Sequence, residues 1–306
     1  MASAFAQRDG AAIAGGEPAA ATLTPAEGWW TRQDRVTEWA YWGIHASCLL
    51  VFWVGVGASD LVLLAVTFYA RMFGITGGYH RYFAHKTYKT SRVFQFALAV
   101  LACSATQKGP LWWAGNHRSH HKHADQPDDI HSPSHGLYHA HQGWIFDGRW
   151  DATPLDRIAD FARYPELVWL NRNHHVPPIA LAVLCAALGG FSGLVWGYVV
   201  STVLLWHATY TINSLAHTWG TRRYETSDTS RNNPWLALLT MGEGWHNNHH
   251  HFCASARQGF RWWEIDLTYY LLRALQSVGV IWEVREPPPH VVAAERASDA
   301  PTRKAA

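Results

Sequence analysis

The chain has 306 residues, of which 16% are charged and 14% aromatic, and its formal net charge is +2. This length fits one domain, and so small a net charge excludes the strongly basic surface that nucleic-acid binding requires. The cysteines Cys48, Cys103, Cys185 and Cys253 form no CxxC pair, so the sequence predicts no disulfide scaffold.

The N-terminal part combines a terminal segment with a pair of apolar segments. Residues 1–28 are rich in Ala and Gly and lack the basic start and apolar core of a signal peptide. We expect them, and the proline-containing tail over 286–306, to be disordered. Residues 39–57 and 60–79 are apolar, with only a short link between them. Each approaches the roughly 20 residues that cross a bilayer as a helix, which predicts a hairpin within a membrane domain over 29–285.

A second pair of apolar segments lies farther along the chain, among shorter amphipathic segments. Residues 93–105 are apolar but too short to span, which favours a helix lying at the membrane interface. Residues 151–175 and 257–282 mix Trp, Tyr and Leu with charges and are typical of helices that cap the spans. Residues 177–195 and 198–217 then predict a second hairpin around a glycine-rich turn.

These patterns predict an all-α integral membrane protein with four transmembrane helices in two hairpins and a cytoplasmic helical cap. The links inside the hairpins carry no Lys or Arg, and positive charge stays on the cytoplasmic side. Both termini and the active site are therefore expected there. A mean hydropathy of −0.14 leaves a soluble helical protein as the alternative. The basic flanking residues are Arg32, Arg35, Arg81, Lys86, Lys89, Arg92, Arg118, Lys122, Arg172, Arg222 and Arg223.

Histidine clustering is the strongest signal in this sequence. Three short boxes span His80–His85, His117–His121 and His246–His250, and His217 follows Asn213 by four residues. Histidine is the commonest metal ligand and a poor general core residue. Residues three and four apart share one face of a helix. The second and third boxes therefore each present converging imidazoles if they are helical.

The first box has a different spacing. His80 and His85 are five apart and would diverge on a regular α-helix. We expect His80 at the end of the second span and His85 just past a bend or in the following turn. So many imidazoles suit two iron ions, each with an open position, better than the few-ligand site of a hydrolytic zinc.

Other residues are candidates to orient the imidazoles. The nearest carboxylates are Glu243 and Asp125, for which the alternative is a helix cap or a turn. Among the remaining histidines, His141 is the best candidate, because it lies in His141-Gln142-Gly143-Trp144.

The linked order of these motifs resembles the membrane-bound fatty acyl desaturases, specifically the stearoyl-CoA (Δ9) desaturase-like family. The resemblance covers about residues 39–260 and rests on Gly74-Ile75-Thr76, the three boxes, Gly143-Trp144 and the Asn213–His217 element. It implies two irons held by nine histidines, with the asparagine reaching iron through water. The implied ligands are His80, His85, His117, His120, His121, Asn213, His217, His246, His249 and His250.

The resemblance also implies the reaction. The family uses dioxygen, two electrons and two protons to remove two hydrogens from a saturated acyl chain, which leaves a cis double bond and water. A methylene C–H has no acidic proton, so an iron–oxygen oxidant must supply the hard chemistry while the protein positions the carbon. The Δ9 position is implied by the resemblance alone.

The expected partners are membrane lipids, a fatty acyl substrate and an electron donor. An acyl-CoA thioester is the first expectation, but Ile145–Trp150 carries an acid and one arginine where the animal enzymes carry basic residues. An acyl carrier protein thioester or an acyl lipid therefore remains open. A separate ferredoxin, rubredoxin or cytochrome is expected to supply the electrons.

The acyl chain needs a long apolar tunnel. Counting back in fours from His80 gives Thr76, Met72 and Phe68, which we hypothesise line the tunnel, with Met72 and Phe68 limiting its depth. The alternative for these residues is helix packing or lipid contact. For the whole chain, the alternatives are a membrane di-iron hydroxylase or monooxygenase and a histidine-rich metal transporter or sensor.

Overall fold

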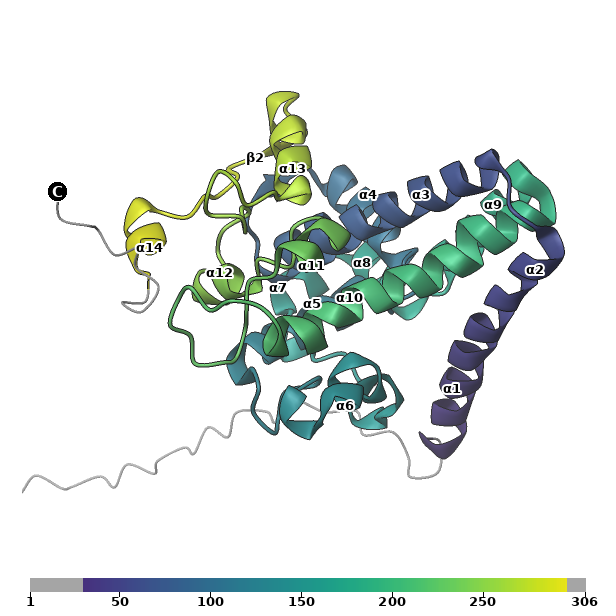
Figure 1. Ribbon diagram of the computed structural model, residues 1–306, viewed down its shortest axis with the longest axis horizontal. Helices are drawn as coiled ribbons and strands as arrows, with labels where there is room; N and C mark the ends of the chain where they lie inside the picture. The colour runs from purple at the N-terminus through teal and green to yellow at the C-terminus, as the bar shows by residue number, and fades with distance from the viewer. Residues whose placement is uncertain (1–29, 296–306) are drawn as a thin grey trace, which may run out of the picture.

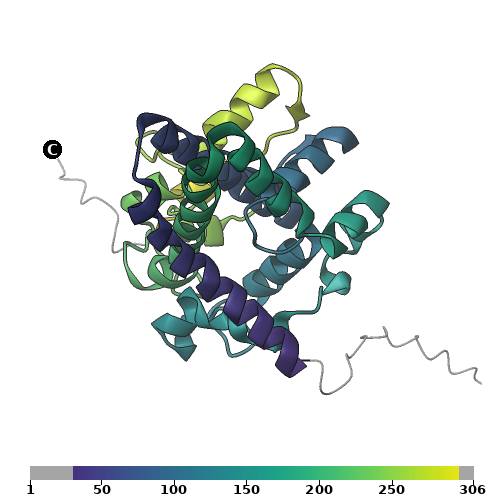
Figure 2. The same cartoon turned by 90° about the vertical axis from the view of Figure 1, so that its right-hand side faces the viewer.

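The computed structural model describes residues 30–295. The expected disordered segment 1–28 lies outside the described residues. The described chain is almost wholly helical: a bundle of long helices extends from a cap built of shorter ones (Figure 1). Seen from the tips of the long helices, α1 crosses the front of the bundle (Figure 2).

The first two apolar segments form a pair of helical stretches. The first contains α1 (Trp30–Ser47), η1 (Cys48–Leu50) and α2 (Val51–Val54), and the second contains α3 (Ala58–Phe73) and η2 (Gly74–Ala84). The turn between them is closed by Asp60, whose carboxylate accepts a hydrogen bond from the Gly57 backbone N–H at 2.9 Å. Ala58–Ala84 is long and apolar enough to cross a membrane.

The later apolar segments form a second hairpin. It contains α9 (Val176–Leu194), η7 (Val195–Val200) and α10 (Ser201–Thr218), and Val176–Thr218 as a whole is also long and apolar enough to cross a membrane. Gly190 has φ +59° and ψ −149°, a conformation that is essentially restricted to glycine. The chain folds back here, so that a Cβ on Gly193 would lie 2.4 Å from the Cys185 carbonyl oxygen.

The long helices are joined by a buried charge. Arg71 on α3 is 1% exposed and donates hydrogen bonds to the hydroxyl oxygens of Ser201 at 2.5 Å and Thr202 at 2.7 Å. Its Nε donates to the carbonyl oxygen of Thr67 at 3.0 Å. Ionisable residues within apolar helices normally face the bundle interior, and Arg71 ties α3 to α10 in this way.

A wide helical turn shapes the end of the second stretch. η2 is a π-helix, in which the His85 N–H donates to the His80 carbonyl oxygen, five residues earlier, at 3.1 Å. Five-residue spacing places both histidines on one side of such a helix. His85 lies in the turn directly after η2, as the spacing predicts. The segment expected at the interface forms α4 (Arg92–Cys103), which packs on η2 because Gly74 leaves no Cβ against the Ala102 backbone.

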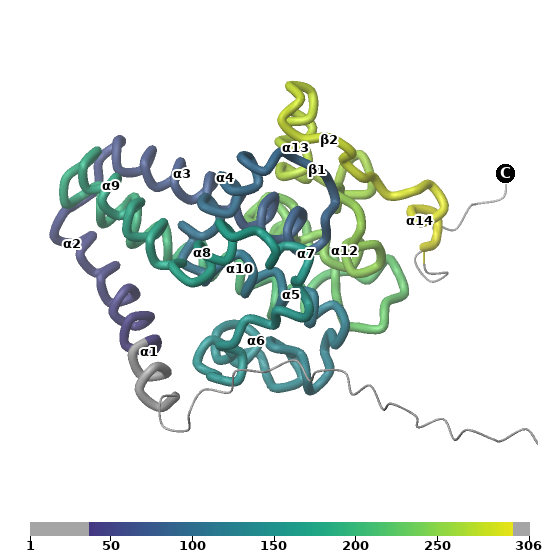
Figure 3. The backbone as a smooth tube through the Cα atoms, turned by 180° about the vertical axis from the view of Figure 1, so that it is seen from behind, coloured from purple at the N-terminus to yellow at the C-terminus, as the bar shows by residue number. Residues whose placement is uncertain are grey.

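The cap is built from short elements between and after the hairpins. β1 and β2 pair antiparallel beside α13 (Figure 3). The ordered chain continues beyond the expected boundary at 285, since the Tyr224 hydroxyl donates to the Val292 carbonyl oxygen at 3.0 Å. The remaining elements are β1 (Lys89–Thr90), α5 (Pro110–His123), η3 (Pro133–His135), α6 (Leu137–His141), η4 (Gly143–Phe146), η5 (Gly148–Trp150), η6 (Leu155–Arg157), α7 (Ala159–Ala162), α8 (Pro165–Arg172), α11 (Pro234–Leu239), α12 (His246–His251), α13 (Leu267–Ser277), β2 (Ile281–Trp282) and α14 (Pro289–Ala293).

Candidate metal centre

The structure gathers the nine box and box-associated histidines into two groups. The ligand nitrogens within each group lie within 4.8 Å of one another. The first group contains His80, His85, His117, His121 and His249, and the second contains His120, His217, His246 and His250. Asn213 lines the cavity beside them, together with His80, His117, His120 and His246.

Helix geometry divides each box between the two groups. On α5, His117 and His121 face the first group and His120 faces the second. On α12 the pattern is reversed, because His246 and His250 face the second group while His249 faces the first. Residues four apart differ by about 40° around a helix, whereas the residue between them in the box lies about 60° or 100° away. Two helices that each contact both groups thereby hold the two groups side by side.

The imidazole nitrogens of the first group point at one another. The Nε2 atom of His249 lies 3.0 Å from that of His80 and 2.9 Å from that of His121. The Nε2 atom of His117 lies 3.1 Å from that of His121 and 3.0 Å from that of His85. A neutral imidazole has one N–H and one lone pair, so five converging nitrogens cannot all pair with each other. A central cation would satisfy every lone pair.

The second group shows the same convergence. The Nε2 atoms of His217 and His246 lie 3.0 Å apart. The Nε2 atom of His250 is buried and has no hydrogen-bond partner within the described chain. Buried polar atoms are normally paired, so this nitrogen fits a metal ligand. The donor sets of both groups therefore suit a transition metal that prefers imidazole.

Carboxylates hold the outer nitrogens of four of these rings. Nδ1 of His120 lies 2.9 Å from Asp129, and Nδ1 of His250 lies 2.8 Å from Asp228. Nδ1 of His80 lies 2.5 Å from Glu243. A carboxylate at Nδ1 fixes the ring and directs the Nε2 lone pair toward a metal.

The fourth carboxylate is Asp125, which lies 3.0 Å from Nδ1 of His217. It also accepts hydrogen bonds from Thr229, at 2.5 Å from the backbone N–H and 2.7 Å from the hydroxyl. Burial opposes ionisation of Asp125, but His217 and Thr229 outweigh it and lower its pKa to about 2. The carboxylate is therefore charged when it meets the ring.

Burial keeps most of the imidazoles neutral. It lowers the pKa of His121 and His249 well below the usual value, and the neighbouring histidines add to the effect. Burial also lowers the pKa of His250, to about 4, although Asp228 opposes the shift. Only a neutral imidazole offers a lone pair to a metal. The site is therefore ready to bind a cation at neutral pH.

Sequence reasoning found some of these orienting residues and missed others. Glu243 and Asp125 each meet a histidine of the two groups, His80 and His217 respectively. His141 instead bonds to His207 and Ser214, which belong to neither group. Asp129 and Asp228 were not anticipated. Asp129 follows His120 by nine residues, which a search for nearby acids could have found, but no local pattern connects Asp228 to His250.

Two adjoining cavities lead to the histidines. The inner cavity, of about 80 Å³, is bounded by His80, His117, His120 and His246. The outer cavity, of about 520 Å³, lies between α1, the segment after α6 and the start of α9. Gln107, Trp112, Trp113, Trp144 and Tyr210 line both. The two cavities together form a passage, lined largely by aromatic side chains, that leads to the histidine groups.

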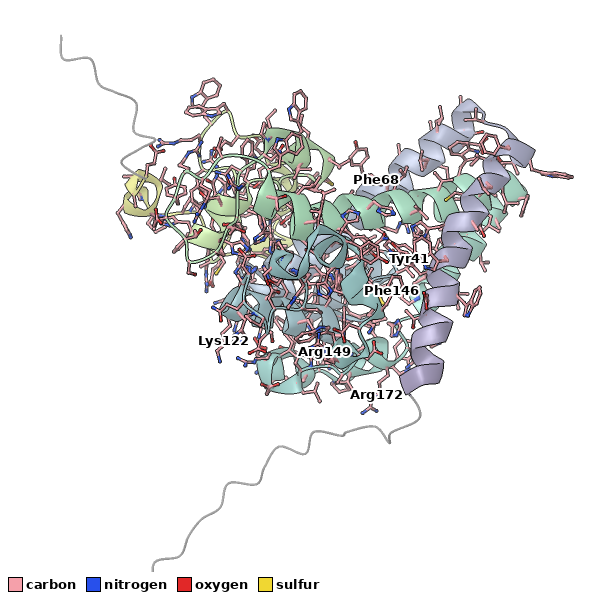
Figure 4. All side chains as sticks on the ribbon, turned by 60° about the horizontal axis from the view of Figure 1, so that its bottom comes forward. Tyr41, Phe68, Lys122, Phe146, Arg149 and Arg172 are labelled. Carbon is pink, nitrogen blue, oxygen red and sulfur yellow. The ribbon has the colours of Figure 1, made fainter. Side chains whose placement is uncertain are left out.

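The tunnel candidates lie differently with respect to this passage. Met72 and Thr76 line the inner cavity beside His80. Phe68 is half-buried and lines neither cavity (Figure 4). On the outer side, Tyr41 of α1 meets Phe146 edge to face at 5.2 Å.

A family model described as fatty acid desaturase matches residues 52–282. The chain belongs to the fatty acid desaturase family. This desaturase is 37% identical over 250 residues to the sn-2 palmitoyl-lipid 9-desaturase of Nostoc sp. (strain 36), covering 80% of this chain and 88% of the relative.

Two further relatives differ in the position and substrate that their names give. The palmitoyl-monogalactosyldiacylglycerol delta-7 desaturase of Arabidopsis thaliana is 34% identical over 266 residues, covering 85% of this chain and 72% of the relative. The acyl-CoA C20 Delta5-desaturase of Anemone leveillei is 36% identical over 248 residues, covering 80% of each chain. The chain is therefore a fatty acid desaturase, and membership of the family alone fixes neither the double-bond position nor the head group.

Proposed function

We propose that this desaturase binds one iron ion in each histidine group and introduces a cis double bond, at the Δ9 position, into a saturated acyl chain. The observation that carries the proposal is the convergence of nine imidazoles into two adjacent groups at the end of an apolar passage. Asn213 lines the cavity beside both groups, and we assign it to the second group, which has one histidine fewer than the first.

The bound metal would supply, with dioxygen, the oxidant for an unactivated C–H bond. The overall change is R–CH2–CH2–R′ + O2 + 2 electrons + 2 protons, giving R–CH=CH–R′ + 2 H2O. The protein side chains provide orientation. Four carboxylates contact the outer nitrogens of the imidazole rings, so the rings are already oriented toward the metal positions. They belong to Asp125, Asp129, Asp228 and Glu243.

The passage positions the acyl chain. Trp112, Trp113 and Tyr210 form apolar walls in both cavities and exclude water from the carbons that pass the histidines. Met72 and Ile75 lie on the wall that α3 and η2 contribute to the inner cavity. The double-bond position would then be set by the length of acyl chain that fits between the head group and the histidines.

The charges around the outer cavity favour an acyl lipid over acyl-CoA. Lys108 pairs with Asp151 and lies over the Trp112 ring at 4.4 Å. Arg149 pairs with Asp147 at 2.5 Å. Each pair places a carboxylate, Asp151 or Asp147, on the wall of the outer cavity, whereas a CoA head group carries several phosphate charges that need cations. A glycerolipid with an uncharged head group makes no such demand.

The helical arrangement supports four membrane spans with the active site on the cytoplasmic side. The chain reverses at Gly55–Gly57 and again at Gly189–Gly190, so each long apolar stretch has an antiparallel neighbour. Three basic side chains, Lys122, Arg149 and Arg172, lie at the opposite end of the molecule from these turns (Figure 4). Positive charge on the cytoplasmic side gives the proposed orientation. A separate ferredoxin, rubredoxin or cytochrome would supply the electrons.

The test is product analysis. Cells that express the protein are fed a saturated fatty acid, and their acyl chains are measured by gas chromatography–mass spectrometry with derivatisation of double bonds. We expect a new cis-monounsaturated chain. An alcohol heavier by one oxygen would replace this proposal with a lipid hydroxylase.

Matched variants assign the activity to the site. His120→Ala should abolish the product, because it removes one nitrogen of the second group. His135→Ala, an exposed histidine of the cap outside both groups, should leave it unchanged. Separating acyl-CoA from glycerolipids before the analysis, after a short pulse of labelled fatty acid, identifies the head group. Label that becomes unsaturated first in acyl-CoA would contradict the lipid assignment.

A further inference from the structure

The outer cavity has walls of two different chemical characters. On the cap side its lining includes the carboxylates of Asp147 and Asp151. On the side of the long helices it is lined by Ile44 of α1 and by Pro178 and Ile179 of α9. Carboxylates hydrogen-bond to polar groups, whereas aliphatic side chains favour contact with hydrocarbon. The cavity therefore suits a molecule with a polar head and an apolar chain.

The exposure of the lining side chains shows where this cavity opens. Among the described lining residues, the exposed ones are Ala40 on α1, His175 just before α9, and Ile179 on α9. Ile179 is 58% exposed, whereas Trp112 and Trp206 on the opposite walls are buried. A residue that both lines a cavity and is exposed marks the rim of an opening. The opening of the outer cavity therefore lies between α1 and the start of α9.

α1 is fastened on the side away from α9. The ring of Tyr41 stacks on Trp206 of α10 at 5.3 Å and lies beside Phe146 (Figure 4). One turn farther along α1, Nε2 of His45 lies 3.0 Å from Nε2 of His207 on α10. Within the described chain, no hydrogen bond, ion pair or ring contact joins α1 to α9. The edge of α1 that faces α9 is therefore left free.

The helix surfaces beside the opening are apolar. Trp39 on α1 is exposed, and so are Val183, Leu184 and Leu188 on α9. In the proposed arrangement of spans, these side chains contact the acyl chains of the bilayer. An opening that lies between two such surfaces leads into the passage from the bilayer and not from water.

A glycerolipid substrate needs an opening of this kind. It carries two acyl chains, and the passage leads one of them to the histidine groups. The other chain must stay in the bilayer, because exposing its methylene groups to water is unfavourable. An opening at the level of the spans allows one chain to lie in the cavities while the other remains among lipids. A single-chain thioester has no second chain to accommodate.

We propose that glycerolipid substrates enter this desaturase laterally from the bilayer, through the opening between α1 and the start of α9, with Ala40 and Ile179 at its edges. The reacting chain passes through the outer cavity to the inner one, the head group stays on the side of Asp147 and Asp151, and the second chain remains outside. This inference rests on the proposed function, because an opening toward the bilayer serves catalysis only if the substrate is a membrane lipid.

The test narrows the opening and compares two substrates. The iron-loaded protein, in vesicles of dioleoyl phosphatidylcholine, is supplied with dithionite-reduced ferredoxin. One substrate is a dipalmitoyl glycerolipid with a galactose head group, and the other is the monopalmitoyl lysolipid with the same head group. Ile179→Trp places an indole at one edge of the opening. We expect kcat/KM for the two-chain lipid to fall by about tenfold or more. The value for the lysolipid should fall much less, because no second chain extends past the indole.

A matched variant separates the opening from the rest of α9. Val183→Trp lies four residues farther along the helix, at an exposed position that lines neither cavity, and should leave both rates at the wild-type value. Ala40→Trp repeats the test from the opposite edge if Ile179→Trp does not fold. Iron content and thermal unfolding are measured for every variant, so that a loss of the metal centre is recognised.

Three outcomes would overturn lateral entry. In the first, narrowing the opening leaves the ratio of the two rates unchanged. In the second, Val183→Trp changes this ratio as much as Ile179→Trp does. In the third, the wild-type protein desaturates palmitoyl-CoA but neither glycerolipid. The proposed desaturation fails separately, in the wild-type protein, if no alkene forms from any of these substrates.

Discussion

Nδ1 of His250 lies 2.8 Å from a carboxylate oxygen of Asp228, although the two residues belong to different segments of the cap. His250 and Ser230 outweigh burial and hold the pKa of Asp228 well below its usual value. The charged carboxylate fixes the ring so that its buried Nε2 faces the second group.

Replacing Asp228 should therefore weaken metal binding. In Asp228→Asn the ring of His250 loses its charged partner, and we expect metal affinity or activity to fall by about 10- to 100-fold. Iron per protein after dialysis and the rate of product formation measure the effect. Asp156→Asn, in an exposed pair with Arg157, is the control. Full iron binding in Asp228→Asn would show that the contact does not orient the ring.

The depth of the inner cavity should depend on Met72. Met72 is fully buried and lines this cavity, so Met72→Ala opens space beside His80 and should shift the preferred acyl length upward. Removing a buried methionine side chain should also cost about 2–5 kcal/mol of stability. Competition between fatty acids of different length measures the preference. Phe68→Ala, outside both cavities, should leave it unchanged, and equal shifts in both variants would contradict this assignment.

The chain reversal within α9 should depend on one glycine. Gly190 has φ +59°, so Gly190→Ala forces a side chain into a strained conformation, at a cost of about 1–3 kcal/mol. Gly189→Ala is a close control, because Gly189 has φ −131° and the nearest atom to an added Cβ is 3.8 Å away. Thermal unfolding in detergent compares the two. Equal melting temperatures would show that the turn tolerates a side chain.

Acid should destabilise the metal-free protein. His250 has a pKa of about 4 in the folded chain and an ordinary value of 6.5, so the unfolded chain binds more protons between these values. Stability then rises with pH across this window and is lost as the pH falls below about 6.5, by about 2 kcal/mol at pH 5 from this residue alone. Thermal unfolding between pH 8 and pH 5 measures the slope. His250→Gln should give a shallower slope than the parent protein.

Local sequence patterns were sufficient to predict the long helices and most of the histidines of the metal centre. The apolar segments became the long helices. The second and third boxes lie on α5 and α12, which is the helical condition under which their histidines were expected to converge. These predictions succeed because hydrophobic length and residues three or four apart act within one helix. Glu243 and Asp125 were also within reach, since each is close in sequence to a box.

The tertiary structure alone decided how the histidines divide. His120 belongs to the second group with His217, whereas its box neighbours His117 and His121 belong to the first. His249 belongs to the first group, whereas His246 and His250 belong to the second. The division arises because each helix presents different faces to the two groups. Asp228 meets His250, and His45 meets His207 across 162 positions of the chain, only after the helices pack. The sequence encodes which residues share a helix face, but the faces that meet are set by the packing of the whole chain.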